Sequence, residues 1–180
     1  MADHITTYTG RHMVPTDPHP EDFFIEDIAH ALSLLCRGNG HVQTFFSVGQ
    51  HCIACAKEAE ARGLSERLAL AALLHDASEC YLSDVPRPFK HTQPAYQELE
   101  NKIISIIFTK FLGSDLTPEE NEKLRAIDDD LLWYDLTALL GEKQSSPPPQ
   151  LHIDFSHDVQ SFEEVEREYL ELYYNLIERA

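Results

Sequence analysis

Positive charge is scarce in this sequence, which has 14 Lys and Arg residues against 31 Asp and Glu residues and a formal net charge of -17. A field of this sign repels the phosphates of nucleic acids and the headgroups of anionic lipids. We therefore expect neither a nucleic-acid duplex nor a membrane as a partner. An anionic ligand would need local positive charge, and the candidates to supply it are Arg37, Arg87 and Lys90.

Cysteine is also scarce, and no apolar leader or membrane-spanning run is visible, so we expect a cytoplasmic protein with free thiols. The four cysteines are Cys36, Cys52, Cys55 and Cys80. Cys52 and Cys55 form a C-x-x-C motif, and His51 precedes Cys55 by one helical turn, which leaves a redox or structural zinc site open. No second C-x-x-C accompanies it, and the small apolar neighbours favour buried packing within a helix.

Strand-like alternation and internal repeats are absent, which favours an all-α fold. A chain of 180 residues can bury ~70% of its unfolded surface in one core, and the 43% hydrophobic fraction supports a folded globule. We predict a single-domain bundle of about six helices over residues 25–180. Residues 1–24 should be irregular, because Pro15, Pro18 and Pro20 forbid a regular helix there.

Apolar periodicity and capping signals place the helices. Ser65 is a candidate N-cap, and Thr117 and Ser161 each open a capping-box pattern. The expected helices span residues 25–37, 48–62, 67–75, 94–112, 118–140 and 162–177. The amphipathic stripe of the last helix should pack back onto the bundle, with a homodimer contact as the alternative. Loop histidines, among them His152 and His157, should be solvated.

Most of the chemical information lies between Leu73 and Lys90. The adjacent pair His75 and Asp76 follows an apolar helix, and Glu79 lies one turn later. Taken alone, such a pair is more often a solvated helix end. Together with Asp84 and Lys90, however, this segment supplies metal ligands, acid–base groups and an anion contact, which are the components of metal-assisted phosphate ester hydrolysis. Imidazole and carboxylate ligands suit zinc, manganese, cobalt or iron, and magnesium stays open.

Four segments together resemble a known family. They are Ser47–His51, His75–Glu79, Asp84–Lys90 and Ile127–Asp128. Their order and spacing are similar to those of the HD-domain phosphohydrolases, with the YfbR-type 5′-deoxynucleotidase branch the nearest. The resemblance runs from roughly residue 25 to residue 140, and it implies an all-α helical fold.

The resemblance implies a metal site and its ligands. These would be His51, His75, Asp76 and Asp128. Three consecutive acids at 128–130 leave the register open by one residue, with Asp129 as the fallback. Asp128 is preferred because the resemblance places an acid seven positions later, where Asp135 stands.

The resemblance also implies roles for residues that do not bind the metal. Glu79 and Asp84 would position the nucleophile or move a proton, Lys90 would neutralise a phosphate oxygen, and Arg37 would line the sugar-phosphate pocket. The branch carries Trp directly after this arginine, whereas Gly38 stands here, so selection against a 2′-hydroxyl is in doubt. Position 83 is Ser where the family has Gly. For His41, contact with a base or phosphate and a local structural hydrogen bond are equally open.

Three functions compete at this point. The leading expectation is a metal-dependent phosphohydrolase of small nucleotides, which releases phosphate from (deoxy)nucleoside 5′-monophosphates. The second is a dNTP triphosphohydrolase, as in the DatZ group of HD enzymes. The third is a nonenzymatic helical binding module with a structural metal, which the two nonligand carboxylates disfavour because a purely structural site does not need them.

Overall fold

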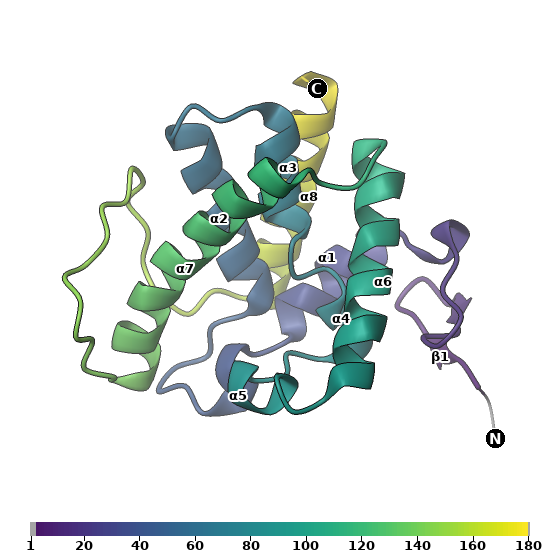
Figure 1. Cartoon of the computed structure of the whole chain (residues 1–180), viewed down its shortest axis with the longest axis horizontal. Coiled ribbons are helices and arrows are strands. Elements are labelled where there is room, and N and C mark those ends of the chain that lie inside the picture. Colours follow the sequence, from purple (N-terminus) through teal and green to yellow (C-terminus); the bar gives the residue numbers. More distant parts are fainter. Residues whose placement is uncertain (1–2, 180) are drawn as a thin grey trace.

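Helices account for nearly all the regular structure in the computed structural model, which describes residues 3–179. The six longer helices are α1 (Ile25–Leu34), α2 (Val48–Ala61), α3 (Glu66–Leu74), α6 (Pro94–Leu112), α7 (Pro118–Leu140) and α8 (Phe162–Arg179). Two single-turn helices lie between α3 and α6, namely α4 (Glu79–Leu82) and α5 (Arg87–Lys90). The expected all-α, single-domain class is confirmed (Figure 1).

The N-terminal segment is more regular than the sequence predicts. Strands β1 (Ile5–Thr6) and β2 (His12–Met13) pair in antiparallel register, and a short 3-10 turn covers Pro20–Asp22. Two residues per strand are too few to produce a visible alternation pattern, so the sequence gives no sign of this short hairpin.

Helix α1 ends three residues earlier than predicted. Leu35 leaves the helical conformation, and Cys36 forms an antiparallel bridge with Ser47. Two backbone hydrogen bonds hold the bridge, from Arg37 N to Phe46 O at 2.9 Å and from Val48 N to Leu35 O at 2.9 Å. Arg37 therefore follows an extended segment and starts a 3-10 turn, Arg37–Gly40, instead of closing the helix.

The predicted N-caps of α3, α7 and α8 all form hydrogen bonds to the first turn of their helices. Ser65 Oγ accepts a hydrogen bond from Leu68 N at 3.3 Å. The hydroxyl of Thr117 accepts from Glu120 N, and the Glu120 carboxylate accepts in return from Thr117 N, which fixes the start of α7. The same reciprocal pair forms between Ser161 and Glu164 ahead of α8. Each cap satisfies backbone donors that a helix start would otherwise leave unpaired.

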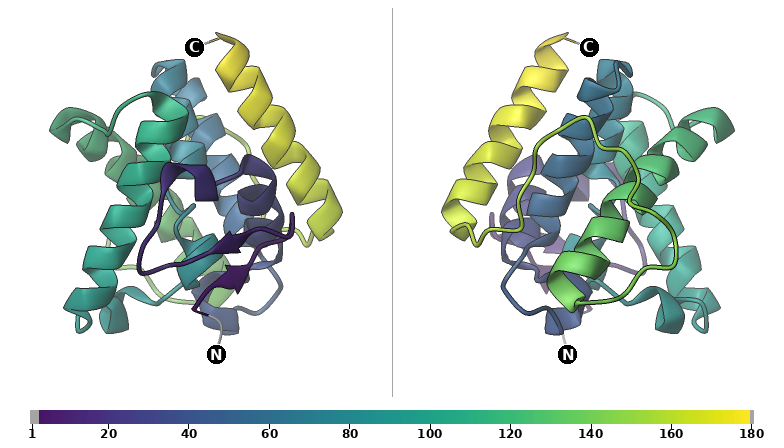
Figure 2. Two further views of the ribbon diagram at one scale, coloured as in Figure 1. Left: turned by 90° about the vertical axis from the view of Figure 1, so that its right-hand side faces the viewer. Right: turned by 90° about the vertical axis from the view of Figure 1, so that its left-hand side faces the viewer.

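Helices α2 and α3 form the centre of the bundle, with α7 against one side of the pair and α6 against α3 (Figure 1). Helix α8 packs against α1, α2 and α3, and the chain between α7 and α8 runs beside α7 before it reaches α8 (Figure 2). The hydroxyl of Tyr169 in α8 donates to Leu73 O of α3 at 2.6 Å. This confirms that the last helix packs onto the bundle.

Close approach at Gly49 lets α1, α2 and α8 meet. A Cβ at this position would lie 3.0 Å from Val165 Cγ1 and 3.2 Å from Leu32 O. The absence of a side chain here brings the first turn of α2 against its two neighbours. Within residues 3–179, no helix combines the length and the apolar character needed to cross a bilayer.

Candidate functional site

Side chains from three helical regions meet at one point of the bundle. His51 comes from α2, Asp128 from α7, and His75 and Asp76 from the turn that follows α3. The Nε2 atom of His51 lies 3.1 Å from Asp128 Oδ1. The Nε2 atom of His75 lies 3.3 Å from Asp76 Oδ2 and 3.8 Å from Asp128 Oδ1. The structure thus brings together all four residues that the family resemblance implies as metal ligands.

A sharp bend after α3 allows two adjacent residues to face the same point. The helix ends at Leu74, and residues 75–78 form a turn in which Ala77 N donates to Leu74 O at 2.9 Å. Neighbours on a straight helix diverge by about 100°. Because the regular helix ends here, Asp76 Oδ2 can lie 3.3 Å from His75 Nε2, which in turn lies 3.8 Å from Asp128 Oδ1.

The two imidazoles are oriented by hydrogen bonds on the side away from this point. His75 Nδ1 donates to Ala72 O at 2.7 Å, and His51 Nδ1 lies 3.0 Å from Asp135 Oδ2. With Nδ1 bonded in this way, each ring would present a lone pair on Nε2 to a metal ion that displaces the Nε2 proton. Metal-binding histidines are held in this way, with the second ring nitrogen bonded to a carbonyl or carboxylate.

The donor set fits a divalent cation. His75 Nε2 is buried and has no hydrogen-bond partner among the described residues. It faces the carboxylates of Asp76 and Asp128, which accept but cannot donate when ionised. Lone pairs of imidazole and carboxylate directed at one another repel unless a proton or a cation lies between them. This orphaned nitrogen and its two acidic neighbours therefore match the needs of a metal ion.

Electrostatics keep both candidate carboxylate ligands ionised. Burial alone raises the pKa of Asp128, but the hydrogen bond with His51 and the positive charges of the two nearby imidazoles outweigh it and hold the pKa well below its usual range. Burial likewise raises the pKa of Asp76, and the charges of His75 and Arg37 lower it by more. Both side chains are therefore anionic, as ligands of a hard or borderline cation must be.

The structure separates Asp128 from its neighbour Asp129. Asp128 is directed at the two imidazoles, whereas the side chain of Asp129 is 50% exposed and pairs with Arg87 at 2.9 Å. The geometry favours the preferred register over the fallback. Metal binding by these residues is itself still a prediction.

Glu79 and Asp84 lie beside the candidate ligands without joining them. Glu79 is buried, and its Oε2 has no hydrogen-bond partner within residues 3–179. Burial, followed by the charges of Asp76 and Asp84, raises the pKa of Glu79 well above its usual range. Asp84 Oδ2 accepts a hydrogen bond from Gly38 N at 3.0 Å, which ties the turn after α4 to the turn that carries Arg37.

The turn between Glu79 and Asp84 contains a strained residue. Ser83, which stands where the resembled family has glycine, adopts φ 77° and ψ 157°. This region of backbone space is essentially restricted to glycine and costs on the order of 1–3 kcal/mol for other residues. Ser83 O also accepts a hydrogen bond from Tyr96 Oη at 3.1 Å.

All three cations that the sequence singled out reach the site, each in contact with carboxylates. Arg37 lies 3.4 Å from Asp76 Oδ2 and 3.2 Å from Asp135 Oδ2. Lys90 pairs with Glu100 at 2.7 Å and lies 3.9 Å from Glu79. Arg87, half exposed on α5, donates to Asp128 Oδ2 at 2.7 Å as well as to Asp129.

A cavity of about 630 Å³ opens beside the four candidate ligands. Its polar side includes Arg37, Asp76, Glu79, Asp84, Lys90 and Asp128. Its apolar side includes Val42, Leu132, Leu136, Leu139 and Leu140. His41 is exposed and lines the rim. The cavity therefore offers charged groups to one end of a ligand and an apolar wall to the other.

His157 belongs to the site, contrary to the expectation that it is solvated. Its Nε2 lies 2.8 Å from Asp135 Oδ1, so Asp135 links His157 to His51. The imidazole packs against Phe46 and Phe155, which leaves only 16% of the side chain exposed. His152 is likewise bound, with Nδ1 2.9 Å from Glu58 Oε1. Neither loop histidine lies in a motif that could have revealed these contacts.

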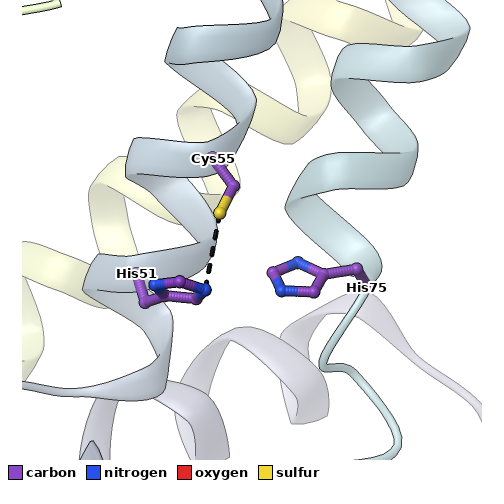
Figure 3. Close-up of side chains that lie close together, drawn as sticks. All are labelled: His51, Cys55 and His75. Atoms are coloured by element: carbon purple, nitrogen blue, oxygen red, sulfur yellow. Dashed lines mark hydrogen bonds between the residues drawn. The ribbon is translucent and has the colours of Figure 1, made fainter. Parts of the chain in front are cut away.

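Cysteine also approaches the site. All four cysteines are free, as expected, and Cys55 Sγ lies 3.4 Å from His51 Nε2. Potential ligand atoms of His51, Cys55 and His75 all lie within 4.8 Å of one another (Figure 3). A second such group comprises Cys52, His75 and Asp76. The expectation of buried packing is correct for both thiols but omits their proximity to the imidazoles.

These features define an all-α protein with a cluster of residues that could hold a metal ion. No family model matches the chain. The chain is similar to the uncharacterized protein YfdR of Escherichia coli (strain K12), with 37% identity over 107 residues, or 59% of this chain and 57% of that protein. An uncharacterized protein of Rhodobacter capsulatus is 38% identical over 109 residues, or 57% of this chain and 55% of that protein. The chain thus spans little more than half the length of both curated relatives.

Proposed function

We propose that this chain is a metal-dependent phosphohydrolase of the HD-domain type, which hydrolyses the phosphate ester of small (deoxy)nucleoside 5′-monophosphates. The observation that carries the proposal is the buried Nε2 of His75. It lacks a hydrogen-bond partner among the described residues and faces two ionised carboxylates at the wall of a cavity. The order of His51, His75, Asp76 and Asp128 along the chain adds support through the family resemblance.

The polar wall of the cavity suits a phosphate monoester. The four residues that would hold a divalent ion are His51, His75, Asp76 and Asp128; zinc, manganese, cobalt, iron and magnesium are the candidates. When bound, such an ion lowers the pKa of water and supplies a nucleophile at neutral pH. Arg37 and Lys90 line the same wall and are placed to bind phosphate oxygens.

Glu79 is the best placed residue to protonate the leaving 5′-oxygen. Its raised pKa keeps it protonated at higher pH than an ordinary glutamic acid, as a general acid requires. Asp84 holds the Arg37 turn in place through Gly38 N and lies on the same wall. Water adds to phosphorus and releases a proton to solvent, the bond between phosphorus and the ester oxygen breaks, and that oxygen leaves with the proton of Glu79. The products are a nucleoside and orthophosphate, and Glu79 then regains a proton from solvent.

The charge of the cavity favours a monophosphate over a triphosphate. Three cations, Arg37, Arg87 and Lys90, face six carboxylates along its lining, which are Asp76, Glu79, Asp84, Asp128, Asp135 and Glu142. Each cation already contacts at least one carboxylate. Apart from the charge of the proposed metal ion, such a site has little uncompensated positive charge for two further phosphates. The apolar wall on α7 suits the flat face of a nucleobase.

The test is a screen of nucleoside monophosphates and triphosphates with manganese, cobalt, magnesium and zinc, with products separated by chromatography. Orthophosphate released from a monophosphate supports the proposal. Tripolyphosphate released from a dNTP would instead show a triphosphohydrolase, and no turnover with any metal would favour a binding module.

A matched pair of variants addresses the ligand assignment. Asp128→Asn should abolish metal-dependent hydrolysis, because it removes the negative charge of a proposed metal ligand that lies beside both imidazoles. Asp129→Asn changes the neighbouring, exposed acid and should retain most of the activity. The reverse result would contradict the site described above.

A further inference from the structure

We infer that Cys55 is a thiolate ligand of the metal ion and that this chain selects zinc-like over magnesium-like cations. The inference rests on the proposed metal site and adds to it a residue outside the family's motif. Figure 3 shows His51 and Cys55 from α2 and His75 from the end of α3 directed toward a common space.

The distances fit one shared ion. Cys55 Sγ lies 3.4 Å from His51 Nε2, and potential ligand atoms of His51, Cys55 and His75 all lie within 4.8 Å of one another. A zinc ion with ordinary bonds to one imidazole nitrogen and one thiolate would hold these atoms roughly 3.6 Å apart in tetrahedral geometry. The helix itself provides this spacing, because residues four apart lie on one face.

A second observation points to the same place. His75 Nε2 is buried and has no hydrogen-bond partner in the described chain, although its ring is fixed by Ala72 O. Cys55 is 0% exposed, and with His51 and His75 it forms a group whose potential metal-binding atoms lie within 4.8 Å of one another. A bound cation would satisfy the imidazole and the sulfur together.

Arg87 limits what Asp128 can contribute. Its guanidinium donates to Asp128 Oδ2 at 2.7 Å, while the other carboxylate oxygen faces His51 and His75. Only one oxygen of Asp128 is therefore turned toward the ion. The sulfur of Cys55 fills the position that a bidentate carboxylate would otherwise take.

The donor set determines the class of metal. Thiolate and imidazole favour zinc, cobalt or cadmium, whereas magnesium and manganese prefer oxygen ligands. The thiol binds as thiolate, so its proton passes to solvent when the metal enters. Replacing Cys55 should therefore weaken zinc binding and leave manganese binding nearly unchanged.

Cys52 provides a matched control on the same helix. It is also 0% exposed and lies near His75 and Asp76. Burial raises the pKa of the Cys52 thiol, which favours its protonated form. It lies one residue after His51 and hence about 100° around the helix. We assign it to core packing.

The experiment titrates the chelator-treated full chain with Co²⁺ and records absorbance alongside bound metal by equilibrium dialysis. We expect a thiolate-to-cobalt charge-transfer band that saturates at one equivalent in the wild type and in Cys52→Ser. The band should be absent from Cys55→Ser and Cys55→Val, and their zinc affinity should fall at least about tenfold. Circular dichroism establishes that the variants fold.

The outcomes separate this inference from the proposed function. One equivalent of Co²⁺ bound to the wild type without the band would overturn the role of Cys55, and hydrolysis could still stand. Loss of the band in Cys52→Ser but not in Cys55→Ser would also overturn it. A thiolate band without nucleotide hydrolysis would support the ligand and contradict the function. No bound Co²⁺ at all would contradict both.

Discussion

At the scale of single residues, the site depends on a change of chain direction between two neighbours. Helix α3 ends at Leu74, and His75 and Asp76 both lie in the turn that follows, so their side chains converge where a continuous helix would separate them. The apolar run of α3 holds this turn against the core, since every residue from Leu68 to Leu74 is buried. Position in the fold thus gives a common dipeptide its specific geometry.

Glu79 gives a prediction for pH dependence. Burial, with the charges of Asp76 and Asp84, raises its pKa, so the protonated acid exists below that raised pKa and is lost as pH rises through it. Activity should therefore fall on the alkaline side. Glu79→Gln should lower kcat by about 10²–10⁴-fold and remove this alkaline limb. A pH series of kcat measures both effects, and an unchanged profile would contradict the assignment.

Ser83 gives a prediction for stability. Glycine at this position relieves the strain of φ 77° but adds freedom to the unfolded chain. The relief is the larger of the two, so Ser83→Gly should raise the free energy of unfolding by about 1 kcal/mol. Denaturant unfolding followed by circular dichroism measures it, and Ser83→Ala, which cannot relieve the strain, is the control.

At the scale of elements, the segment between α7 and α8 connects to the metal centre. His157 contacts Asp135, and Asp135 contacts His51. A proline-rich stretch therefore acts as more than a spacer. It brings His157 back to Asp135 on α7, and through Asp135 it orients the candidate ligand His51.

Replacing His157 should weaken metal binding without removing a ligand. His157→Ala leaves Asp135 with one partner fewer and should lower metal affinity about tenfold, as expected for a residue that orients a ligand. His157→Gln can restore a donor to Asp135 and should recover part of the loss. Competition with a chromophoric chelator measures the affinity. Equal affinity in the alanine variant and the wild type would show that the contact is only structural.

The sequence was informative where local signals act and silent where tertiary packing decides. The starts of α3, α7 and α8 follow from Ser65, Thr117 and Ser161, because a capping side chain acts within one turn. The end of α1 was misplaced, since a bridge to distant Ser47 stops it. His157 had no signal, because its position depends on packing against Phe46, over a hundred residues earlier in the chain.

At the scale of the whole molecule, the candidate metal centre joins α2, the end of α3 and α7. Helices α2 and α3 form the centre of the bundle and α7 packs against them, so an ion bound there would link parts of the chain far apart in sequence. The four predicted ligands span residues 51 to 128. Unfolding must separate them.

Metal removal should therefore lower stability. A ligand that binds only the native state stabilises it by roughly 2.7 kcal/mol at a free concentration of 100 times its Kd. We expect a chelator to lower the Tm by several degrees, and re-added zinc to restore it. Differential scanning calorimetry of the wild type, with Asp128→Asn as the insensitive control, measures the shift. An equal response in both proteins would place the stabilising metal elsewhere.

The packing of α8 has a consequence for the order of events during synthesis. Tyr169 of α8 donates a hydrogen bond to Leu73 O near the end of α3. His157 contacts Asp135 only when the segment before α8 has packed against the bundle. All four predicted ligands leave the ribosome earlier. Until α8 follows, the apolar sides of α1 and α3 that it covers stay open to water, and chaperones or self-association compete with folding during that interval.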